Sequence, residues 1–254
     1  MPVVDMSLAD TAVLLLAGFA SGVVNALAGG GTFITFGALT LIGLPPIAAN
    51  ATSAIAQLPG YLFSTVAYGR ELKVIGRAVL PFLAVSLIGG VAGALVLLAI
   101  DNPQFRSAVP WLLIGATTLF AAGPRLAAAL KTRRLAARPS TAWAVQLCVA
   151  TYGGFFGAGL GIMMLASLGL TEGDDFHRLN AMKVLLSLAI SLVAVAVFAS
   201  GGVVAWNEAL VMIVAVAVGG YAGVHAARRL PQSLVRGAVI TIGIALTVYY
   251  AVSG

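Results

Sequence analysis

Long apolar runs separated by short loops constrain this chain more than any other feature. A bilayer core about 30 Å thick needs roughly 20 apolar residues per helix, and eight runs have about this length. Only 9% of the residues are charged and 61% are hydrophobic, whereas soluble domains carry roughly 25% charged residues. The sequence therefore predicts an all-α polytopic membrane protein, with runs at 8–27, 47–68, 78–100, 107–122, 141–158, 180–199, 208–227 and 233–252.

Two shorter apolar runs follow clusters of glycine. The runs 32–44 and 162–170 come after glycines at 29–31 and at 157, 159 and 161. Both are too short to cross a bilayer as ideal helices. Either they are re-entrant hairpins, which leaves eight spans, or they are half-helices that still change side, which gives ten.

The placement of basic residues favours ten segments. With ten segments and the N-terminus outside, Arg106 is the single loop cation outside the cell, and Lys183 lies just inside a span. The eight-span alternative also places Arg178, Arg228, Arg229 and Arg236 outside. Short cytoplasmic loops should hold the excess of Lys and Arg. We therefore predict about ten transmembrane segments, two of them short or broken, in a bacterial cytoplasmic membrane with both termini outside.

The sequence also carries an internal repeat. A shift of 130 residues superposes Gly29 and Gly31 on Gly159 and Gly161, Asn50-Ala51 on Asn180-Ala181, Gly89-Gly90 and Gly93 on Gly219-Gly220 and Gly223, and Arg106 on Arg236. Each half then holds five segments, and an odd number inverts the second half relative to the first. Paired interrupted helices in inverted repeats are typical of alternating-access transporters. An old duplication kept for close helix packing is the alternative, and we favour it for the glycines from 89 to 93 and their counterparts.

These segments divide the chain into three parts. We predict a first transmembrane repeat over 1–122, a basic cytoplasmic linker over 123–140 and a second repeat over 141–254.

Two stretches of the first half resemble a known family. The sequence GFASGVVNALAGGGTFIT at 18–35 and the continuation LIGLPPIAANATS at 41–53 are similar to signatures of the sulfite exporter TauE/SafE family, also called the toluene sulfonate uptake permeases. In the second half the matching glycine triplet reads Gly-Leu-Gly at 159–161, and Lys183 stands where the first half has Ser53. The resemblance implies transport of small sulfur-containing anions, sulfite or organosulfonates, in either direction.

Polar residues within the spans are the candidate substrate ligands, because polar groups are costly at membrane depth. Asn50, Ser53 and Gln57 share one helix face, and the 130-residue shift gives the matching face in the second half. Glycine breaks and helix N-termini also suit anions, because they present free N–H groups. The candidate substrate-binding residues are Asn25, Gly30, Gly31, Thr32, Asn50, Ser53, Gln57, Tyr152, Gly159, Gly161, Asn180, Lys183 and Ser187.

Lys183 is open to three interpretations. Its ammonium group can bind the substrate anion, can pair with Asp174 or Asp175, or can extend to the nearby cytoplasmic interface. The sequence leaves these alternatives open.

Other function classes fit less well. An intramembrane enzyme is disfavoured because the stretch GFASG at 18–22 has one residue too many for a serine-protease motif and His225 lies near a helix end. No cofactor, metal site or P-loop is predicted. The net charge of +6 lies mostly in short loops, so we expect no nucleic-acid partner.

We predict a secondary anion transporter acting by alternating access at a midplane site. An anion channel and a transporter of another small carboxylate or oxoanion are alternatives, and a homo-oligomer in the lipid bilayer stays open.

Overall fold

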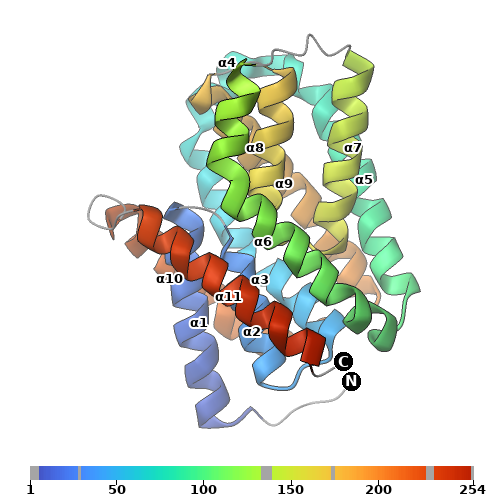
Figure 1. The fold of residues 1–254 in the computed structure, drawn as a ribbon, viewed down its shortest axis with the longest axis vertical. Helices are drawn as coiled ribbons and strands as arrows, with labels where there is room; N and C mark the ends of the chain where they lie inside the picture. Colours follow the sequence, from blue (N-terminus) through green and yellow to red (C-terminus); the bar gives the residue numbers. More distant parts are fainter. Residues whose placement is uncertain (1–5, 28–29, 133–138, 173–174, 227–231, 253–254) are drawn as a thin grey trace.

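The computed structural model describes residues 6–27, 30–132, 139–172, 175–226 and 232–252. Every regular element within these residues is helical (Figure 1). Four stretches are long and apolar enough to cross a membrane by length and composition, at Leu8–Asn25, Gly69–Ala99, His177–Ser200 and Trp206–Gly223. The fold is therefore the expected all-α arrangement of apolar helices, while the count of ten crossings stays a prediction.

The first half of the chain folds into α1 (Leu8–Leu27), α2 (Gly31–Leu41), α3 (Pro46–Ala67), α4 (Gly69–Ile75), the 3-10 turn η1 (Gly76–Val79), α5 (Leu80–Ala99) and α6 (Asn102–Thr132). The second half folds into α7 (Pro139–Phe155), α8 (Leu160–Thr171), α9 (Phe176–Ser200), α10 (Trp206–Ala226) and α11 (Gln232–Val252). Because α6 continues to Thr132, the first part of the expected linker is helical, and its remaining basic residues up to 138 lie outside the described residues.

Helix positions recur at the shift found in the sequence. α3 begins at Pro46 and α9 at Phe176, while α6 begins at Asn102 and α11 at Gln232, each pair 130 residues apart. The packing partners exchange in the same way. In the shift, α1 corresponds to α7, α3 to α9 and α5 to α10. Accordingly, α1 packs on α10 and α7 packs on α5. Likewise, α10 packs on α3 and α5 packs on α9. Two pairs of corresponding helices also pack on each other, α3 on α9 and α6 on α11.

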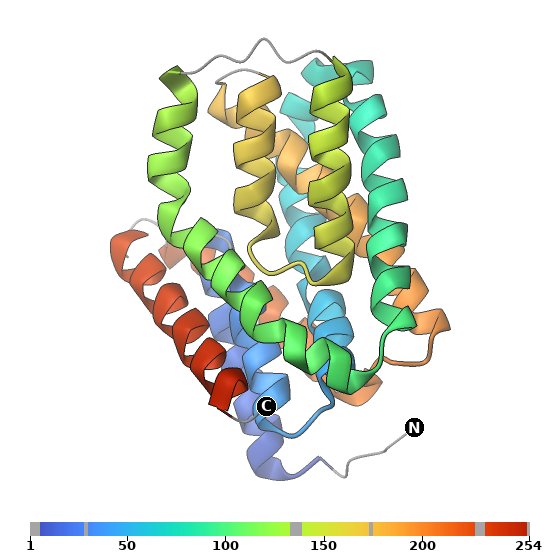
Figure 2. The ribbon, with the colours of Figure 1, turned by 45° about the vertical axis from the view of Figure 1, so that its right-hand side comes forward.

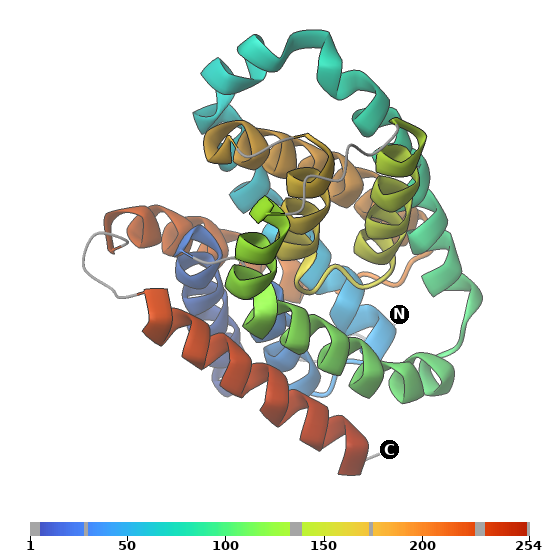
Figure 3. The ribbon, with the colours of Figure 1, turned by 45° about the horizontal axis from the view of Figure 1, so that its top comes forward.

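Each half begins with a helical hairpin. Figure 2 shows α7 and α8 side by side, with both free ends at one end of the molecule and their connection in its interior. α1 and α2 form the corresponding hairpin at the opposite end, where α1 begins and α2 leads into α3. Figure 3 shows α4 and η1 extending from the end of α3 to the start of α5 across the end of the bundle that holds the free ends of α7 and α8.

Glycine allows the closest helix contacts. A side chain at Gly93 would collide with the carbonyl oxygen of Thr151, and one at Gly219 with that of Phe19. Side chains at Gly89 and Gly90 would also meet atoms within 3 Å, so the packing interpretation is confirmed for these positions. A side chain at Gly220, in contrast, would meet nothing within 4 Å. Close packing therefore does not explain why glycine stands at that position.

Candidate functional site

One face of α3 lines a row of internal cavities. Asn50, Ala54, Gln57, Tyr61 and Ser64 recur at steps of three and four residues, so they lie on one side of the helix, and Tyr68 at its C-terminal cap continues the face. Asn50 to Tyr61 line a smaller cavity of about 20 Å³. Tyr61 to Tyr68 line a larger cavity of about 150 Å³. The shared residue Tyr61 shows that the two cavities adjoin.

The corresponding face of α9 lines the same cavities from the other side. Asn180 and Val184 line the larger cavity, while Ser191, Ala194 and Phe198 line the smaller one. Each of these residues stands 130 positions after a lining residue of α3. α3 and α9 pack on each other, so the two faces meet between the halves of the chain. Asn50 and Gln57 of the expected α3 face and Asn180 and Lys183 of the expected α9 face line these cavities, and their role in one substrate site stays a prediction.

The larger cavity also receives the starts of both short helices. Gly30 caps α2 with φ 89°, and Gly159 caps α8 with φ 75°. These left-handed conformations favour glycine, because a side chain there is strained. The first N–H groups of a helix lack intrahelical partners and carry partial positive charge. The remaining lining residues come from both halves and include Asn25, Thr32, Gly157, Leu160, Gly161 and Lys183.

Lys183 brings a positive charge to the larger cavity. Its ammonium group donates to the side-chain oxygen Oδ1 of Asn180 at 2.9 Å. Asp175 instead caps α9, where its carboxylate accepts from the backbone N–H groups of His177 and Arg178. Asp174 lies outside the described residues. Within the described part of the chain, Lys183 has no salt bridge, so its charge faces a neutral cavity wall.

Hydrogen bonds in the first half hold the α1–α2 hairpin against α3. The Ser21 hydroxyl donates to the Gly31 carbonyl at 2.9 Å, and Gln57 Nε2 donates to Ser21 Oγ at 2.7 Å. The hydroxyls of Ser53 and Thr35 lie 2.6 Å apart. Ser53 therefore has a structural partner and does not line either cavity.

The end of the bundle opposite the larger cavity is closed. Asn50 Nδ2 donates to the Phe155 carbonyl at 2.9 Å, and the backbone N–H of Ala205 donates to Thr52 Oγ1 at 3.1 Å. Both bonds join the two halves of the chain. Phe36, Phe105, Phe155 and Phe156 pack ring against ring in the same region.

A third cavity lies beyond this closed region. Its volume is about 390 Å³, and Ile47 and Ala48 at the start of α3 line it together with the acidic residues Asp101 and Glu208. Along α3 the order is therefore this third cavity, the smaller cavity and then the larger cavity. Ala48 lines the third cavity and Asn50 the smaller one, and Ala49 between them is fully buried.

Most of the sequence-predicted ligands converge. The larger cavity is lined by Asn25, Gly30, Thr32, Gly159, Gly161, Asn180 and Lys183, and the smaller one by Thr32, Asn50 and Gln57. Neither cavity is lined by Gly31, Ser53, Tyr152 or Ser187. The list of candidate ligands from the sequence does not include Tyr61, Ser64, Tyr68 and Ser191, although the helical period that starts at Asn50 and Asn180 reaches all four.

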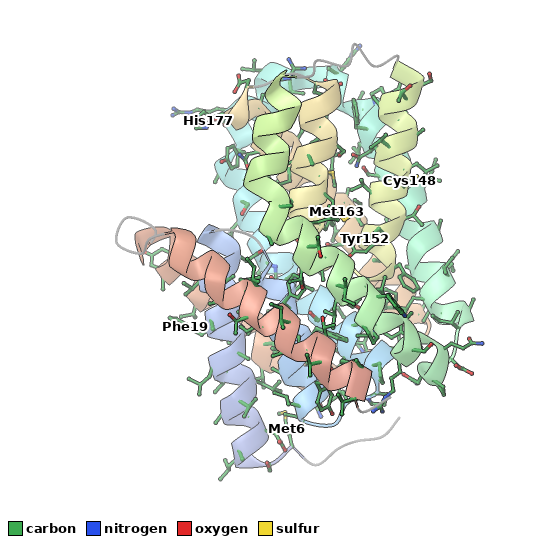
Figure 4. The ribbon with its side chains drawn as sticks, viewed as in Figure 1. Met6, Phe19, Cys148, Tyr152, Met163 and His177 are labelled. Carbon is green, nitrogen blue, oxygen red and sulfur yellow. The ribbon has the colours of Figure 1, made fainter. Side chains whose placement is uncertain are left out.

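Two polar side chains outside the cavities have distinct surroundings. The Tyr152 hydroxyl donates to the Ala158 carbonyl at 2.7 Å, which ties the end of α7 to the glycine-rich turn that follows it. Figure 4 shows Tyr152 inside the bundle, whereas His177 projects from the end of the molecule near the start of α9. His177 lies in the first turn of α9 and is exposed.

Comparison with known proteins identifies the family of the chain. The family model for the sulfite exporter TauE/SafE matches residues 14–250. A probable membrane transporter protein of Haemophilus influenzae is 27% identical over 96% of this chain and 95% of its own length. A probable membrane transporter protein of Sinorhizobium is 26% identical over 96% and 93%. The probable membrane transporter protein YfcA of Escherichia coli K12 is 26% identical over 91% and 85%. The chain belongs to the sulfite exporter TauE/SafE family of membrane transporters.

Proposed function

We propose that this protein is a secondary transporter that moves small sulfur-containing anions, sulfite or organosulfonates, by alternating access. The observation that carries the proposal is the larger cavity, where the N-termini of two glycine-capped helices and the Lys183 ammonium converge. Oriented N–H groups and a lysine are the groups that bind sulfonate or sulfite oxygens. The described residues that line this cavity include no Asp or Glu, which would repel an anion.

The size and amide groups of the cavity suit such a substrate. A volume of about 150 Å³ is many times the roughly 10–15 Å³ that one water molecule needs. Asn25 and Asn180 supply side-chain amides from opposite halves of the chain. Their N–H groups can donate to substrate oxygens, and the sulfite exporter description of the family supports a sulfur oxoanion as cargo.

The two halves form inverted repeats in this proposal. The exchange of packing partners between the halves and the opposite positions of the two hairpins support it. A hairpin that enters and leaves the membrane on one side returns the chain to that side, as two complete crossings would. The α1–α2 and α7–α8 pairs therefore keep the sidedness of the ten-segment prediction, with Arg70, Lys73, Arg77 and Arg178 in the cytoplasm and Arg106 outside.

Alternating access then follows from the closed outer end. In this proposal the larger cavity faces the basic end, which the sequence predicts to be cytoplasmic, and the conformation is assigned as inward-facing. Access from outside requires that the hydrogen bonds from Asn50 to Phe155 and from Ala205 to Thr52 break together. Packed helices have discrete alternative arrangements rather than continuous ones, which suits a transporter with two states. A channel would need one continuous pore, and none of the three cavities that α3 lines extends along the whole helix.

Ligand-induced stabilisation tests the proposal. The purified protein is heated with sulfite, sulfate, thiosulfate, taurine, isethionate, sulfoacetate and aryl sulfonates at matched ionic strength. A ligand present at about 100 times its Kd adds roughly 2.7 kcal/mol of stability. We expect at least one sulfite or sulfonate to raise the melting temperature, with small carboxylates as the control. A folded protein that no sulfur anion stabilises, or that carboxylates stabilise more, contradicts the proposed substrate class.

A further inference from the structure

The smaller cavity contains a buried oxygen atom without a partner. Gln57 is 2% exposed, and within the described residues its side-chain oxygen Oε1 accepts no hydrogen bond. Gln57 also lines this cavity, whose volume of about 20 Å³ suits one guest the size of a water molecule. Buried polar atoms in proteins nearly always have a partner, so this one points to a bound species.

The hydrogen bonds around Gln57 fix which way its amide faces. The Gly31 carbonyl can only accept, so the Ser21 hydroxyl donates its proton there. Ser21 Oγ must then accept from Gln57, which requires that Gln57 presents its NH₂ group to Ser21. The same NH₂ group lies 3.3 Å from Thr35 Oγ1. The amide oxygen of Gln57 is left to face away from this network.

Asn50 is oriented by the same logic. The Phe155 carbonyl can only accept, so Asn50 presents its NH₂ group to it. The side-chain oxygen Oδ1 of Asn50 is thereby free to serve the cavity that Asn50 lines. The hydroxyl-bearing residues Thr32 and Ser191 line the cavity as well. Four side chains with neutral oxygen atoms, from the three helices α2, α3 and α9, thus line one small space.

The end of α7 adds negative partial charge. α7 ends at Phe155, and the carbonyls of Gly153 and Gly154, which also line the cavity, accept no backbone hydrogen bond within the described residues. The last carbonyls of a helix are unpaired, and the C-terminal end of the helix dipole attracts cations. The carbonyls at the end of α7 therefore border the smaller cavity alone, because Gly153 and Gly154 do not line the larger one, whereas the starts of α2 and α8, at Thr32 and Leu160, border both.

We infer that the smaller cavity binds one sodium ion. Neutral amide, hydroxyl and carbonyl oxygens are ligands for hard cations. The described lining residues include no carboxylate, so the cavity lacks both the charge that a divalent ion requires and a carboxyl group that would carry a proton. Thr32 borders both cavities, which brings the cation close to the anion, where their charges attract. Coupling of sodium to anion transport rests on the proposed function, whereas sodium binding does not.

Sodium-dependent stability tests the site. The purified protein is heated without anion substrate in NaCl, KCl or choline chloride at equal ionic strength. We expect sodium at about 100 times its Kd to raise the melting temperature by about 5 °C or more over choline. Gln57→Leu should abolish the difference. Ser191→Ala, a smaller change, should raise the sodium concentration for half-maximal stabilisation several-fold and serves if Gln57→Leu does not fold.

Gln146 provides the matched control. It is 1% exposed, its Oε1 also lacks a partner, and its NH₂ group donates to Ser86, but it lines neither cavity. Gln146→Leu should lower stability and retain the full sodium effect. Equal melting temperatures in all three salts would assign the cavity to a water molecule, and an unchanged sodium effect in both Gln57→Leu and Ser191→Ala would place sodium elsewhere. Either result overturns the inference, while anion-induced stabilisation in the same samples reports separately on the proposed function.

Discussion

Helices α3 and α9 occupy corresponding places in the two halves and carry different chemistry on the same face. Asn50 and Asn180 match, but Ser53 is matched by Lys183 and Gln57 by Ser187. On α3 the serine and the glutamine bond to Thr35 and Ser21. On α9 the lysine lines the larger cavity, and the Ser187 hydroxyl has no partner within the described residues.

This difference separates the features that recur between the two halves from those that differ. The backbone positions and the packing pairs recur, so both halves place a polar face toward the other. The polar groups of α3 mainly hold the α1–α2 hairpin, whereas α9 contributes the positive charge. We therefore expect substitutions on α3 to change stability first and those on α9 to change anion affinity first.

The largest effect should come from the close contacts that both halves share. Gly93→Ala and Gly219→Ala each place a methyl group against a backbone carbonyl of the neighbouring helix. We expect each to lower the free energy of unfolding by about 1–3 kcal/mol or more, because overpacked cores must shift their backbone. Gly220→Ala is the control, since it meets open space and should change stability little. Thermal denaturation of the purified variants checks this, and equal melting temperatures for the variants at 219 and 220 would contradict the packing described.

Lys183→Ala against Ser53→Ala tests the comparison directly. Hydrogen bonds to charged groups contribute about 1.5–3 kcal/mol, so Lys183→Ala should weaken anion binding roughly 10- to 100-fold. Ser53→Ala should leave anion affinity near the wild-type value, because its hydroxyl bonds to Thr35 and lines neither cavity. Binding is measured by titration of the anion that stabilises the wild-type protein.

A charge-preserving variant separates binding from packing at this position. Lys183→Arg should restore part of the affinity that Lys183→Ala loses. If Lys183→Ala folds normally and binds the anion with wild-type affinity, the lysine extends to the interface instead of serving the site.

A smaller difference in unfolding free energy is expected between alanine variants of Ser53 and Ser187. Ser53→Ala removes a hydrogen bond and should cost about 0.5–1.5 kcal/mol of unfolding free energy. Ser187 is 1% exposed and its hydroxyl lacks a partner in the described residues, so Ser187→Ala should be neutral or slightly stabilising. Denaturation midpoints of the two variants make the comparison, and a large loss for Ser187→Ala would reveal a partner that the structure does not show.

The smallest effect concerns Glu172 at the end of α8, whose counterpart at the end of α2 is the non-titrating Ile42. Desolvation raises the pKa of Glu172 above its ordinary value of 4.5, and Arg178, 3.5 Å away, partly opposes the rise. A carboxyl group with a raised folded-state pKa stabilises the fold below its unfolded pKa, and this contribution is lost as pH rises through the folded value. Melting temperature should therefore fall slightly above about pH 4.5, and Glu172→Gln should flatten this slope. An identical slope in the variant would contradict the assignment.

Part of the fold followed from the sequence because it depends on local chemistry. The short helices begin at glycines that adopt positive φ, and runs of apolar residues locate the long helices. Hydropathy does not encode where a chain turns back, so the pairing of α1 with α2 and of α7 with α8 appears only in three dimensions. The two glycine caps depart from the 130-residue shift by one residue, because Gly30 and Gly159 lie 129 residues apart.

The candidate site was predictable to the extent that helical period decides it. Asn50, Gln57, Asn180 and Lys183 line the cavities as their spacing indicates. Ser53 and Tyr152 have the same polar character, yet each bonds to a nearby group and lines neither cavity. Which polar residue faces a cavity and which satisfies a neighbour depends on tertiary contacts, and a single sequence does not contain them.

Exchange in liposomes tests the central claim most directly. Purified protein is reconstituted, loaded with the sulfite or sulfonate that stabilises it, and supplied with labelled anion outside. A secondary transporter should show saturable uptake that internal unlabelled anion accelerates, and Lys183→Ala should raise the half-saturating concentration. Conductive flux that neither saturates nor responds to internal anion would contradict alternating access at this site.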